Sequence, residues 1–427
     1  MLAMISLALL FALLALGMPI GFALALCGIA GLYYLGGYDT VFGVLQTVPL
    51  STASGYDLVT LPMFLLMAEF IIVSRIADDL FDTATKFIGH LRGGLGIATA
   101  LAGAGLAAIT GSSTAAAATL SVASLPAMIK HGYERSMAAG VVAISGTLAM
   151  LIPPSIAMVV YAIIAGIGVG PMLLAGIIPG VLVTLTIALT VRFLVIRDPR
   201  LAPTTAKAPW KERLASLRIT GPMVVLILLV TGVIYAGIAT PTEASALGAF
   251  GALLLSMRAN ASKSQLWGAV GQAVRASCMI FTIIIGAKIF GYFFTMTQFT
   301  QDLIAWVSSL GLNRYLVIVA ILLLYLVLGF FLDQIAILTI TVPVILPLVT
   351  SLGFDPIWFG VIVILMAEVG LVTPPLGLNA FVVARATNRP VGEIFRGVTP
   401  YVLAHLVLVG IFVAFPQLIL WLPNSAN

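Results

Sequence analysis

The chain has 427 residues, of which 61% are hydrophobic and 8% are charged, whereas soluble domains carry about 25% charged residues. This composition excludes a soluble globular protein and predicts an all-α polytopic membrane protein. The net charge of +5 comes from basic residues spread between apolar segments. They form no single basic patch, so we expect no nucleic-acid partner.

The first apolar stretch spans residues 2–17, and no Lys or Arg precedes Arg75. A secretory signal peptide needs a positive start, so we expect a first membrane span with its N-terminus outside. Further spans of this half are predicted at 19–37, 58–74, 136–166 and 172–196. Another apolar region, 94–129, is interrupted centrally by polar residues.

A polar segment, "RDPRLAPTTAKAPWKERLASLR", separates the two halves of the chain. Beyond it, spans are predicted at 221–238, 242–257, 277–296, 357–386 and 398–422, and 314–350 is again an interrupted apolar region. Two predicted spans, 136–166 and 357–386, each contain consecutive prolines. Proline inside a helix costs about 3 kcal/mol, and in hydrocarbon the freed carbonyls cannot turn to water. We therefore expect both helices to be broken for a functional reason.

The two halves are related by an offset of 221 residues, the separation of Pro153 from Pro374 in "LIPPSI" and "VTPPLG". The same offset places Pro126 on Pro347, and Ser112 on Asp333. The sequence therefore predicts repeat 1 at 1–200, a cytoplasmic linker at 201–220 and repeat 2 at 221–427. Within the repeats we expect a scaffold at about 1–93 and 221–313, and transport elements at about 94–196 and 314–422.

If each interrupted region is a re-entrant hairpin, each repeat has five crossings, so the second repeat is inverted. With the N-terminus outside, 18 of the 20 basic residues then fall on the inner side, and only Lys288 and Arg314 fall elsewhere. Six crossings per repeat would weaken this bias. We expect two inverted repeats, each with five spans, one of them broken, and one re-entrant helical hairpin. Both termini are then periplasmic, and this is the build of a secondary transporter.

The hairpin tips and helix breaks hold the candidate site. The first tip reads "ITGSSTAAAATL", in which Gly111 allows a tight reversal. Ser112 or Ser113 can cap the half-helix that begins near Thr114. A cap alone is one interpretation. The other is a Na⁺ site in which hydroxyl and carbonyl oxygens of the tip face Ile152 and Pro153.

The second tip, "FFLDQIAILTITVPVILP", places Asp333 and Gln334 at membrane depth. An acid there is a functional candidate by default, although Asp333 could simply cap the following half-helix. A second Na⁺ site would combine Asp333 with Thr373, Gly377 and Asn379. Half-helix N-termini carry partial positive charge and suit a carboxylate.

These motifs, in this order, resemble the large membrane subunit of TRAP transporters, the tripartite ATP-independent periplasmic carriers. The similarity extends over essentially the whole chain. It implies Na⁺-coupled import of an organic acid, such as a C4-dicarboxylate, keto acid or sialic acid, by an elevator mechanism in the bacterial inner membrane. It also implies two partners, a small four-span membrane subunit and a soluble periplasmic substrate-binding protein, besides the membrane lipid. We expect the acid to contact the tips and breaks at Ser113, Thr114, Ser155, Gln334, Pro375 and Asn379.

Two alternatives come from other classes. A stand-alone divalent-anion/Na⁺ symporter of the same fold would need no binding protein, but that family usually carries Ser-Asn-Thr tips. An intramembrane hydrolase would need a Ser/His pair or facing aspartates. Ser112 has no nearby His in the sequence, and the counterpart of Asp333 is Ser112 rather than a second acid. We therefore expect no enzyme, no P-loop ATP use and no transition-metal site.

Overall fold

A computed structural model describes residues 2–74 and 76–425, and over these residues it contains helices and no strand. Arg75, which the charge analysis assigns to the inner side, lies outside the described residues. Among the described residues, eight helices are long and apolar enough to cross a membrane, and five further apolar helices have 10–17 residues. The prediction of an all-α membrane protein is confirmed.

The first half of the chain contains eleven α-helices within the described ranges. They are α1 (Leu2–Ala15), α2 (Ile20–Ala53), α3 (Thr60–Ser74), α4 (Ile76–Ile88), α5 (Gly94–Thr110), α6 (Ser113–Ala123), α7 (Leu125–Lys130), α8 (Arg135–Gly146), α9 (Ile156–Ala165), α10 (Val169–Ala175) and α11 (Ile177–Arg197). Short 3₁₀ turns lie at Tyr56–Val59, Thr147–Met150 and Pro199–Leu201.

The second half contains ten α-helices among the residues described. They are α12 (Trp210–Tyr235), α13 (Pro241–Arg258), α14 (Lys263–Met296), α15 (Phe299–Ser309), α16 (Arg314–Phe331), α17 (Gln334–Ser351), α18 (Pro356–Leu371), α19 (Leu378–Thr387), α20 (Val391–Ala414) and α21 (Gln417–Ser425). Helices are thus interrupted between α5 and α6, α8 and α9, α16 and α17, and α18 and α19, where the sequence predicts two tips and two breaks.

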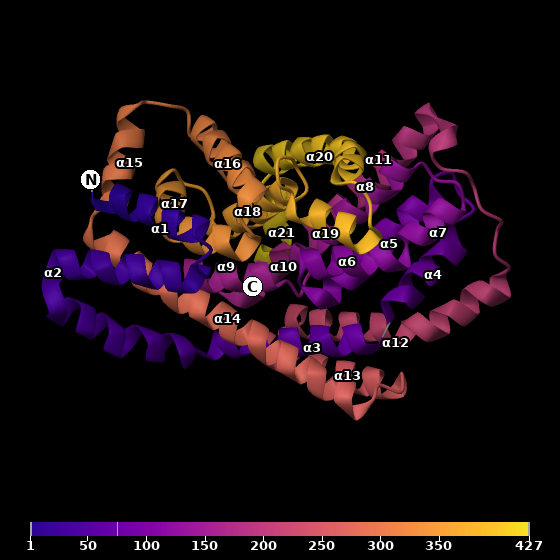
Figure 1. The fold of residues 1–427 in the computed structure, drawn as a ribbon, viewed down its shortest axis with the longest axis horizontal. Helices are drawn as coiled ribbons and strands as arrows, with labels where there is room; N and C mark the ends of the chain where they lie inside the picture. The colour runs from indigo at the N-terminus through magenta and orange to yellow at the C-terminus, as the bar shows by residue number, and fades with distance from the viewer. Residues whose placement is uncertain (1, 75, 426–427) are drawn as a thin grey trace.

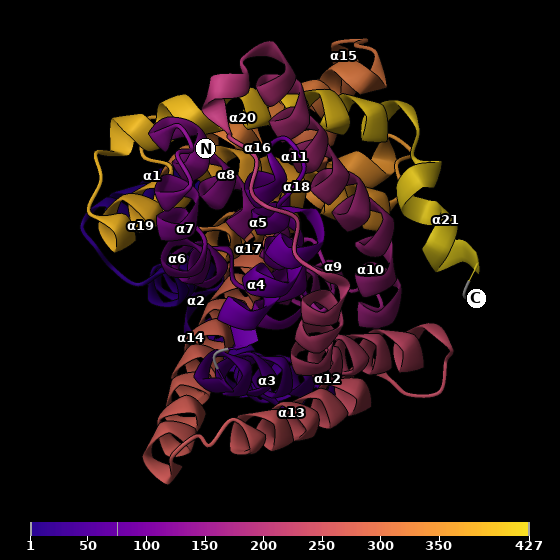
Figure 2. The same cartoon turned by 90° about the vertical axis from the view of Figure 1, so that its right-hand side faces the viewer.

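The helices form two layers. In both ribbon views α3, α12, α13 and the start of α14 lie along the lower side of the molecule, and α14 runs from there to α2 (Figures 1 and 2). In this lower layer α2 packs against α14, and α3 packs against α13. A buried contact of 2.8 Å between the hydroxyl oxygens of Thr60 and Thr242 joins the two halves there. The upper layer is likewise shared, because α6 packs on α19, α9 on α17 and α8 on α20.

Three helices extend beyond the spans predicted from hydropathy. α2 continues to Ala53 through a kink at Gly37, α14 begins at Lys263, and α12 begins at Trp210, within the predicted linker. These extensions contain polar and charged residues, so a hydropathy window does not detect them. α14 begins with a capping box between Ser262 and Gln265. Such a cap provides hydrogen-bond partners for the first amides of a helix, so the helix can begin outside the apolar stretch.

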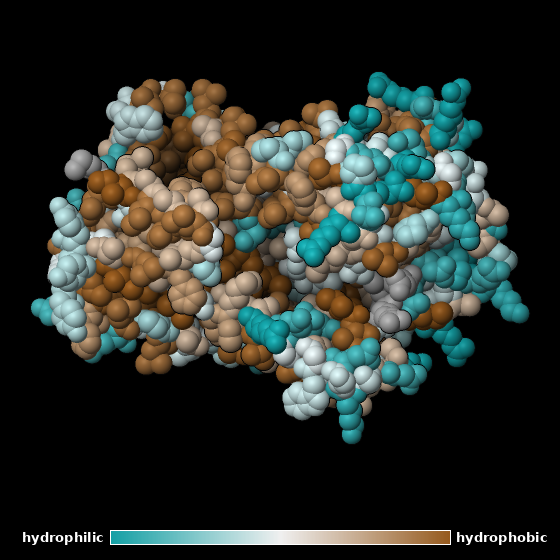
Figure 3. All heavy atoms as spheres, viewed as in Figure 1, coloured by the Kyte–Doolittle hydropathy of each residue, from teal (hydrophilic) through white to brown (hydrophobic). Residues whose placement is uncertain are grey.

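Hydrophilic and hydrophobic residues are unevenly distributed over the surface. Hydrophilic residues gather at the right-hand end of the molecule, over α7 and the linker that leads to α12, and hydrophobic residues cover much of the left half (Figure 3). The right-hand end therefore carries residues of the predicted inner side.

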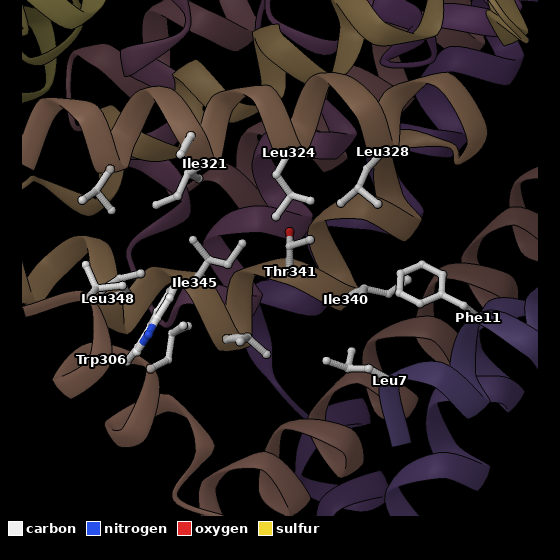
Figure 4. A pocket seen from close by; sticks show the side chains of 15 residues that line it. Leu7, Phe11, Trp306, Ile321, Leu324, Leu328, Ile340, Thr341, Ile345 and Leu348 are labelled. Carbon is white, nitrogen blue, oxygen red and sulfur yellow. The ribbon is translucent and has the colours of Figure 1, made fainter. Parts of the chain in front are cut away.

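An apolar cavity of about 430 Å³ separates α16 and α17 from α1 and α15 (Figure 4). Ile321, Leu324 and Leu328 line it on α16, and Leu7 and Trp306 face them from α1 and α15. Its one lining hydroxyl, that of Thr341, donates to the Tyr325 hydroxyl at 2.6 Å. Apart from the indole nitrogen of Trp306, the rest of the lining is hydrocarbon, so the cavity is unsuited to an ion or a carboxylate.

Candidate transport site

The first hairpin reverses at Gly111. This residue has φ 53°, in the left-handed region that glycine adopts readily. A methyl group added at Gly103 would contact Leu120, so α5 and α6 run antiparallel about the tip. The same construction at Gly111 would meet the backbone nitrogen of Ile156 at 3.3 Å. The first tip therefore lies against the N-terminus of α9, and the ion site predicted between this tip and the first break stays a prediction.

Serines cap both half-helices at this place. The Ser112 hydroxyl accepts from the Ala115 amide at 3.4 Å and lies 3.3 Å from the Thr114 hydroxyl. Across the first break, the Ser155 hydroxyl accepts from the Met158 amide at 3.3 Å and donates to the Met150 carbonyl. Two helix N-termini thus meet with hydroxyl oxygens beside them, an arrangement that favours an anion or oxygen ligands for a cation.

Ile152 and Pro153, the two other residues predicted in the first break, have apolar side chains that bring no polar group to the site. Pro153 is buried and joined to Pro154 by a cis peptide bond. The Ile152 side chain lies beside Gly180 of α11. At Ile152 and Pro153, only the backbone oxygens can therefore serve as polar ligands.

The second hairpin reverses at Asp333. Its antiparallel helices are linked by the Tyr325–Thr341 hydrogen bond. Asp333 is exposed, and its carboxylate accepts from the Ala336 amide at 3.0 Å. It lines a cavity of about 610 Å³ together with Cys278 and Thr282 of α14. The capping role considered for Asp333 is therefore present, and it leaves one face of the carboxylate toward a cavity.

Gln334 ties this tip to α18. Its side-chain nitrogen donates to the Ile364 carbonyl at 3.1 Å, and its side-chain oxygen is buried without a hydrogen-bond partner. At 1.5 Å per residue, Ile364 lies about 12 Å along α18 from the second break, which begins at Val372. The pairing of Asp333 with this break therefore stays a prediction.

The second break lies at 372–377. Its Thr373 hydroxyl donates to the Val369 carbonyl at 2.6 Å, and Pro375 is exposed and joined to Pro374 by a cis peptide bond. Gly377, with φ 57°, begins α19 without a side-chain cap. Two residues later, Asn379 is fully buried, and neither its side-chain oxygen nor its nitrogen has a hydrogen-bond partner. An unpaired buried amide costs about 1–3 kcal/mol, which a bound ligand would offset.

Glu368 is a further buried polar residue of this region. It is 1% exposed, its carboxylate oxygens lack a hydrogen bond of good geometry, and the Ser113 hydroxyl of the first tip lies beside it. The sequence offers one signal for Glu368, an acid five residues before the second break. Only the fold shows that it faces Ser113. The structure thus brings the first tip close to elements of both halves.

The comparisons with known proteins agree with this architecture. A family model described as "Tripartite ATP-independent periplasmic transporter, DctM component" matches residues 7–418. The C4-dicarboxylate TRAP transporter large permease protein DctM of Pseudomonas aeruginosa is 36% identical over 379 residues, which cover 87% of each chain. The protein of the same name from Rhodobacter capsulatus is 32% identical over 443 residues and covers 99% of each chain. The sialic acid TRAP transporter large permease protein SiaM of Vibrio cholerae is 30% identical over 415 residues, covering 96% of each chain.

A solved structure shares the fold. The YdaH transporter of Alcanivorax borkumensis has a TM-score of 0.65 and 17% sequence identity, and the match covers 90% of this chain and 91% of that chain. The family match and the curated relatives extend over nearly the whole sequence, and no enzyme family is indicated. The chain is therefore a member of the DctM family, the large permease component of tripartite ATP-independent periplasmic transporters.

Proposed function

We propose that this permease imports an organic acid together with Na⁺ across the bacterial inner membrane. The acid is delivered by a soluble periplasmic binding protein, and a small four-span subunit completes the membrane unit. Relatives are named for C4-dicarboxylates, 2,3-diketo-L-gulonate, sialic acid and ectoine. Each of these compounds carries a carboxylate, so a carboxylate is the shared feature that the site must recognise.

The observation that carries the proposal is the contact between Gly111 and the N-terminus of α9. It brings two half-helix N-termini together inside the protein, with the hydroxyls of Ser112 and Ser155 beside them. Such termini attract a carboxylate, while hydroxyl and carbonyl oxygens suit a hard cation such as Na⁺. Substrate and ion can therefore bind at adjoining positions.

Buried unpaired oxygens fit the proposed Na⁺ and substrate ligands. The side-chain oxygens of Gln334 and Asn379 lack hydrogen-bond partners, and both residues are at most 1% exposed. Three further predicted ligands lie in the interrupted segments: Ser113 at the first tip, and Thr373 and Gly377 in the second break. A bound ion or acid would satisfy groups whose burial is otherwise unfavourable.

The layered fold supports an elevator mechanism built on inverted repeats. α2, α3 and α12–α14 would form the static scaffold, while the hairpins and broken helices would carry the substrate. Helix pairs recur across the halves, since α6 packs on α19 and α17 on α9. This recurrence is what an internal two-fold axis in the membrane plane would produce. Both termini then lie in the periplasm, and the linker lies in the cytoplasm.

The test is transport in proteoliposomes that contain this chain and its small subunit. Labelled succinate, sialic acid and ectoine would each be offered under an inward Na⁺ gradient, with and without the proposed periplasmic binding protein. We expect uptake of one substrate only when both Na⁺ and the binding protein are present. Uptake without the binding protein would favour a stand-alone symporter, and uptake without Na⁺ would refute the coupling.

A further inference from the structure

A groove lies between α11 and α20, away from the tips and breaks. Its volume is about 850 Å³, and it is lined by α11 over 186–197 and by α20 over 396–411. The two helices run antiparallel here, because Arg197 at the end of α11 and Arg396 near the start of α20 both line it. The groove thus has two arginines at one end and extends away from them along both helices.

Most of the groove is apolar, and its lining side chains are exposed on the surface of the protein. The side chains of Leu189, Phe193, Leu403 and Val407 line it and are 52–66% exposed. The lining threonines offer no free donor, because each donates its hydroxyl hydrogen to a carbonyl of its own helix, as Thr190 does to Thr186 at 2.7 Å. Beyond the arginines, a ligand here therefore meets almost only hydrocarbon.

The two arginines are available for an anion. The salt bridges recorded for the described residues, Lys86–Asp82 and Arg389–Glu393, involve neither of them. The Arg197 guanidinium lies 4.4 Å from the centre of the Phe193 ring, which holds it over the groove.

The acids close to these arginines are already hydrogen-bonded. Glu134 is near enough to Arg396 for the positive charge to favour its ionised form, and its carboxylate accepts from the amides of Ser136 and Met137. Asp198, next to Arg197, accepts from the Arg200 amide at 3.0 Å. Neither acid needs an arginine to satisfy its oxygens, so both guanidinium groups keep donors for a ligand.

The length of the groove matches one leaflet. At 1.5 Å per residue, 186–197 is about 17 Å long and 396–411 about 22 Å long, and half of a hydrocarbon core is about 15 Å thick. A single acyl chain would therefore fit from the arginines to the centre of the membrane.

We propose that this groove binds one anionic phospholipid, with its phosphate between Arg197 and Arg396 and an acyl chain along α11 and α20. Guanidinium groups match phosphate oxygens in a bidentate geometry. A soluble anion would leave the apolar length unexplained. A helix of a partner protein would fill that length and would need an acidic residue at this end to pair with the two arginines, whereas a phospholipid supplies both the charge and the apolar chain. The charge analysis places both arginines on the cytoplasmic side, where anionic lipids are enriched.

The probe is phosphatidylglycerol titrated onto the purified full-length chain in detergent, with bound lipid counted by native mass spectrometry. Phosphatidylcholine and inorganic phosphate serve as the neutral lipid and the soluble anion. We expect one tightly retained phosphatidylglycerol, and weaker binding by about fivefold for Arg197→Gln and about thirtyfold for Arg197→Gln/Arg396→Gln. Ala404→Trp, which fills the apolar part, should also displace the lipid while both arginines remain.

The matched control is Arg192→Gln/Arg200→Gln. It removes the same charge from the same end of α11, and neither residue lines the groove. Retained lipid in this control supports the site. Equal loss in both double variants, equal retention of phosphatidylcholine, or full competition by inorganic phosphate would overturn the proposal. Release of the lipid on adding the small subunit would also overturn it and assign the groove to a partner helix.

Discussion

The backbones of Gly140 in α8 and Gly397 in α20 are in direct contact. A methyl group added to Gly397 would overlap the Ser136 carbonyl, and one added to Gly140 would overlap the Gly397 carbonyl carbon. Small residues let membrane helices approach this closely, and the close packing supplies dispersion energy that lipid cannot replace. This contact joins one helix of each half of the chain.

Gly397→Ala should therefore loosen the α8–α20 pair. We expect a loss of about 1–3 kcal/mol, the usual cost of overpacking, measured as a lower unfolding temperature in detergent. Gly410→Ala is the matched control, because it lies in the same helix with no atom within 4 Å of the added carbon. Comparable loss in both variants would mean that close packing is not the cause.

Asp333→Asn separates the charge of Asp333 from its capping role. Asparagine caps a helix about as well as aspartate, so the fold should persist. If the carboxylate stabilises Na⁺, its loss should cost about 1.5–3 kcal/mol, or about tenfold to over a hundredfold in the Na⁺ concentration for half-maximal uptake. Ser112→Ala should cost less, since a carbonyl or water can replace a hydroxyl.

Asp355→Asn provides the control for that experiment, because Asp355 caps α18 through the amides of Ile357 and Trp358 and lies outside the tips. Its Na⁺ dependence should match that of the unmodified protein. If Asp333→Asn also leaves Na⁺ activation unchanged, Asp333 is a helix cap only.

Glu134 should make stability depend on pH at the start of α8. Burial disfavours its charge, but the amides of Ser136 and Met137, the Ser136 hydroxyl and the charge of Arg396 together hold its pKa below the ordinary 4.5. As the pH falls, the unfolded chain therefore protonates Glu134 at a higher pH than the folded chain does. The stabilisation is complete above pH 4.5 and is lost as the pH falls through the lowered pKa.

The difference in unfolding temperature between the unmodified protein and Glu134→Gln measures this effect. We expect the Glu134 cap to stabilise the folded protein by about 0.5–2 kcal/mol near neutral pH, and this stabilisation should decrease in acid. Ser136→Ala removes one donor and should move the loss toward pH 4.5. A difference that is independent of pH would show that the Glu134 charge does not act on the fold.

Topology can be tested with single cysteines at Thr204 and Ser425, both exposed. The background would lack Cys27 and Cys278. In whole cells, a thiol reagent that cannot cross the inner membrane should label Ser425→Cys, and it should label Thr204→Cys only after permeabilisation. Labelling of Thr204→Cys alone in intact cells would invert the five-plus-five arrangement.

The interruptions were predictable from sequence because their causes are local. Two consecutive prolines at each break remove two backbone donors, whereas single prolines such as Pro343 and Pro347 stay inside α17. Gly111 adopts a left-handed turn without strain. A segment of apolar residues around such a break leaves few other structures possible. The positions of the first tip and of both breaks therefore follow from the local sequence.

Contacts between the halves were not predictable in the same way. Ser113 lies beside Glu368, and Thr60 meets Thr242, because of how complete helices pack. No local pattern encodes these distances. The helical extension of α12 back to Trp210 was not predictable from hydropathy for another reason, since it mixes charged residues with apolar ones.

The cavity between α16–α17 and α1–α15 bears on how easily these elements could shift (Figure 4). Its walls meet through aliphatic and aromatic groups, and its one hydroxyl is satisfied within the hairpin by Tyr325. Attraction between such walls depends on contact area and has no preferred direction. Sliding one wall past the other by a helical turn would break no hydrogen bond across this gap. The second hairpin therefore faces α1 and α15 across an apolar interface without directional contacts.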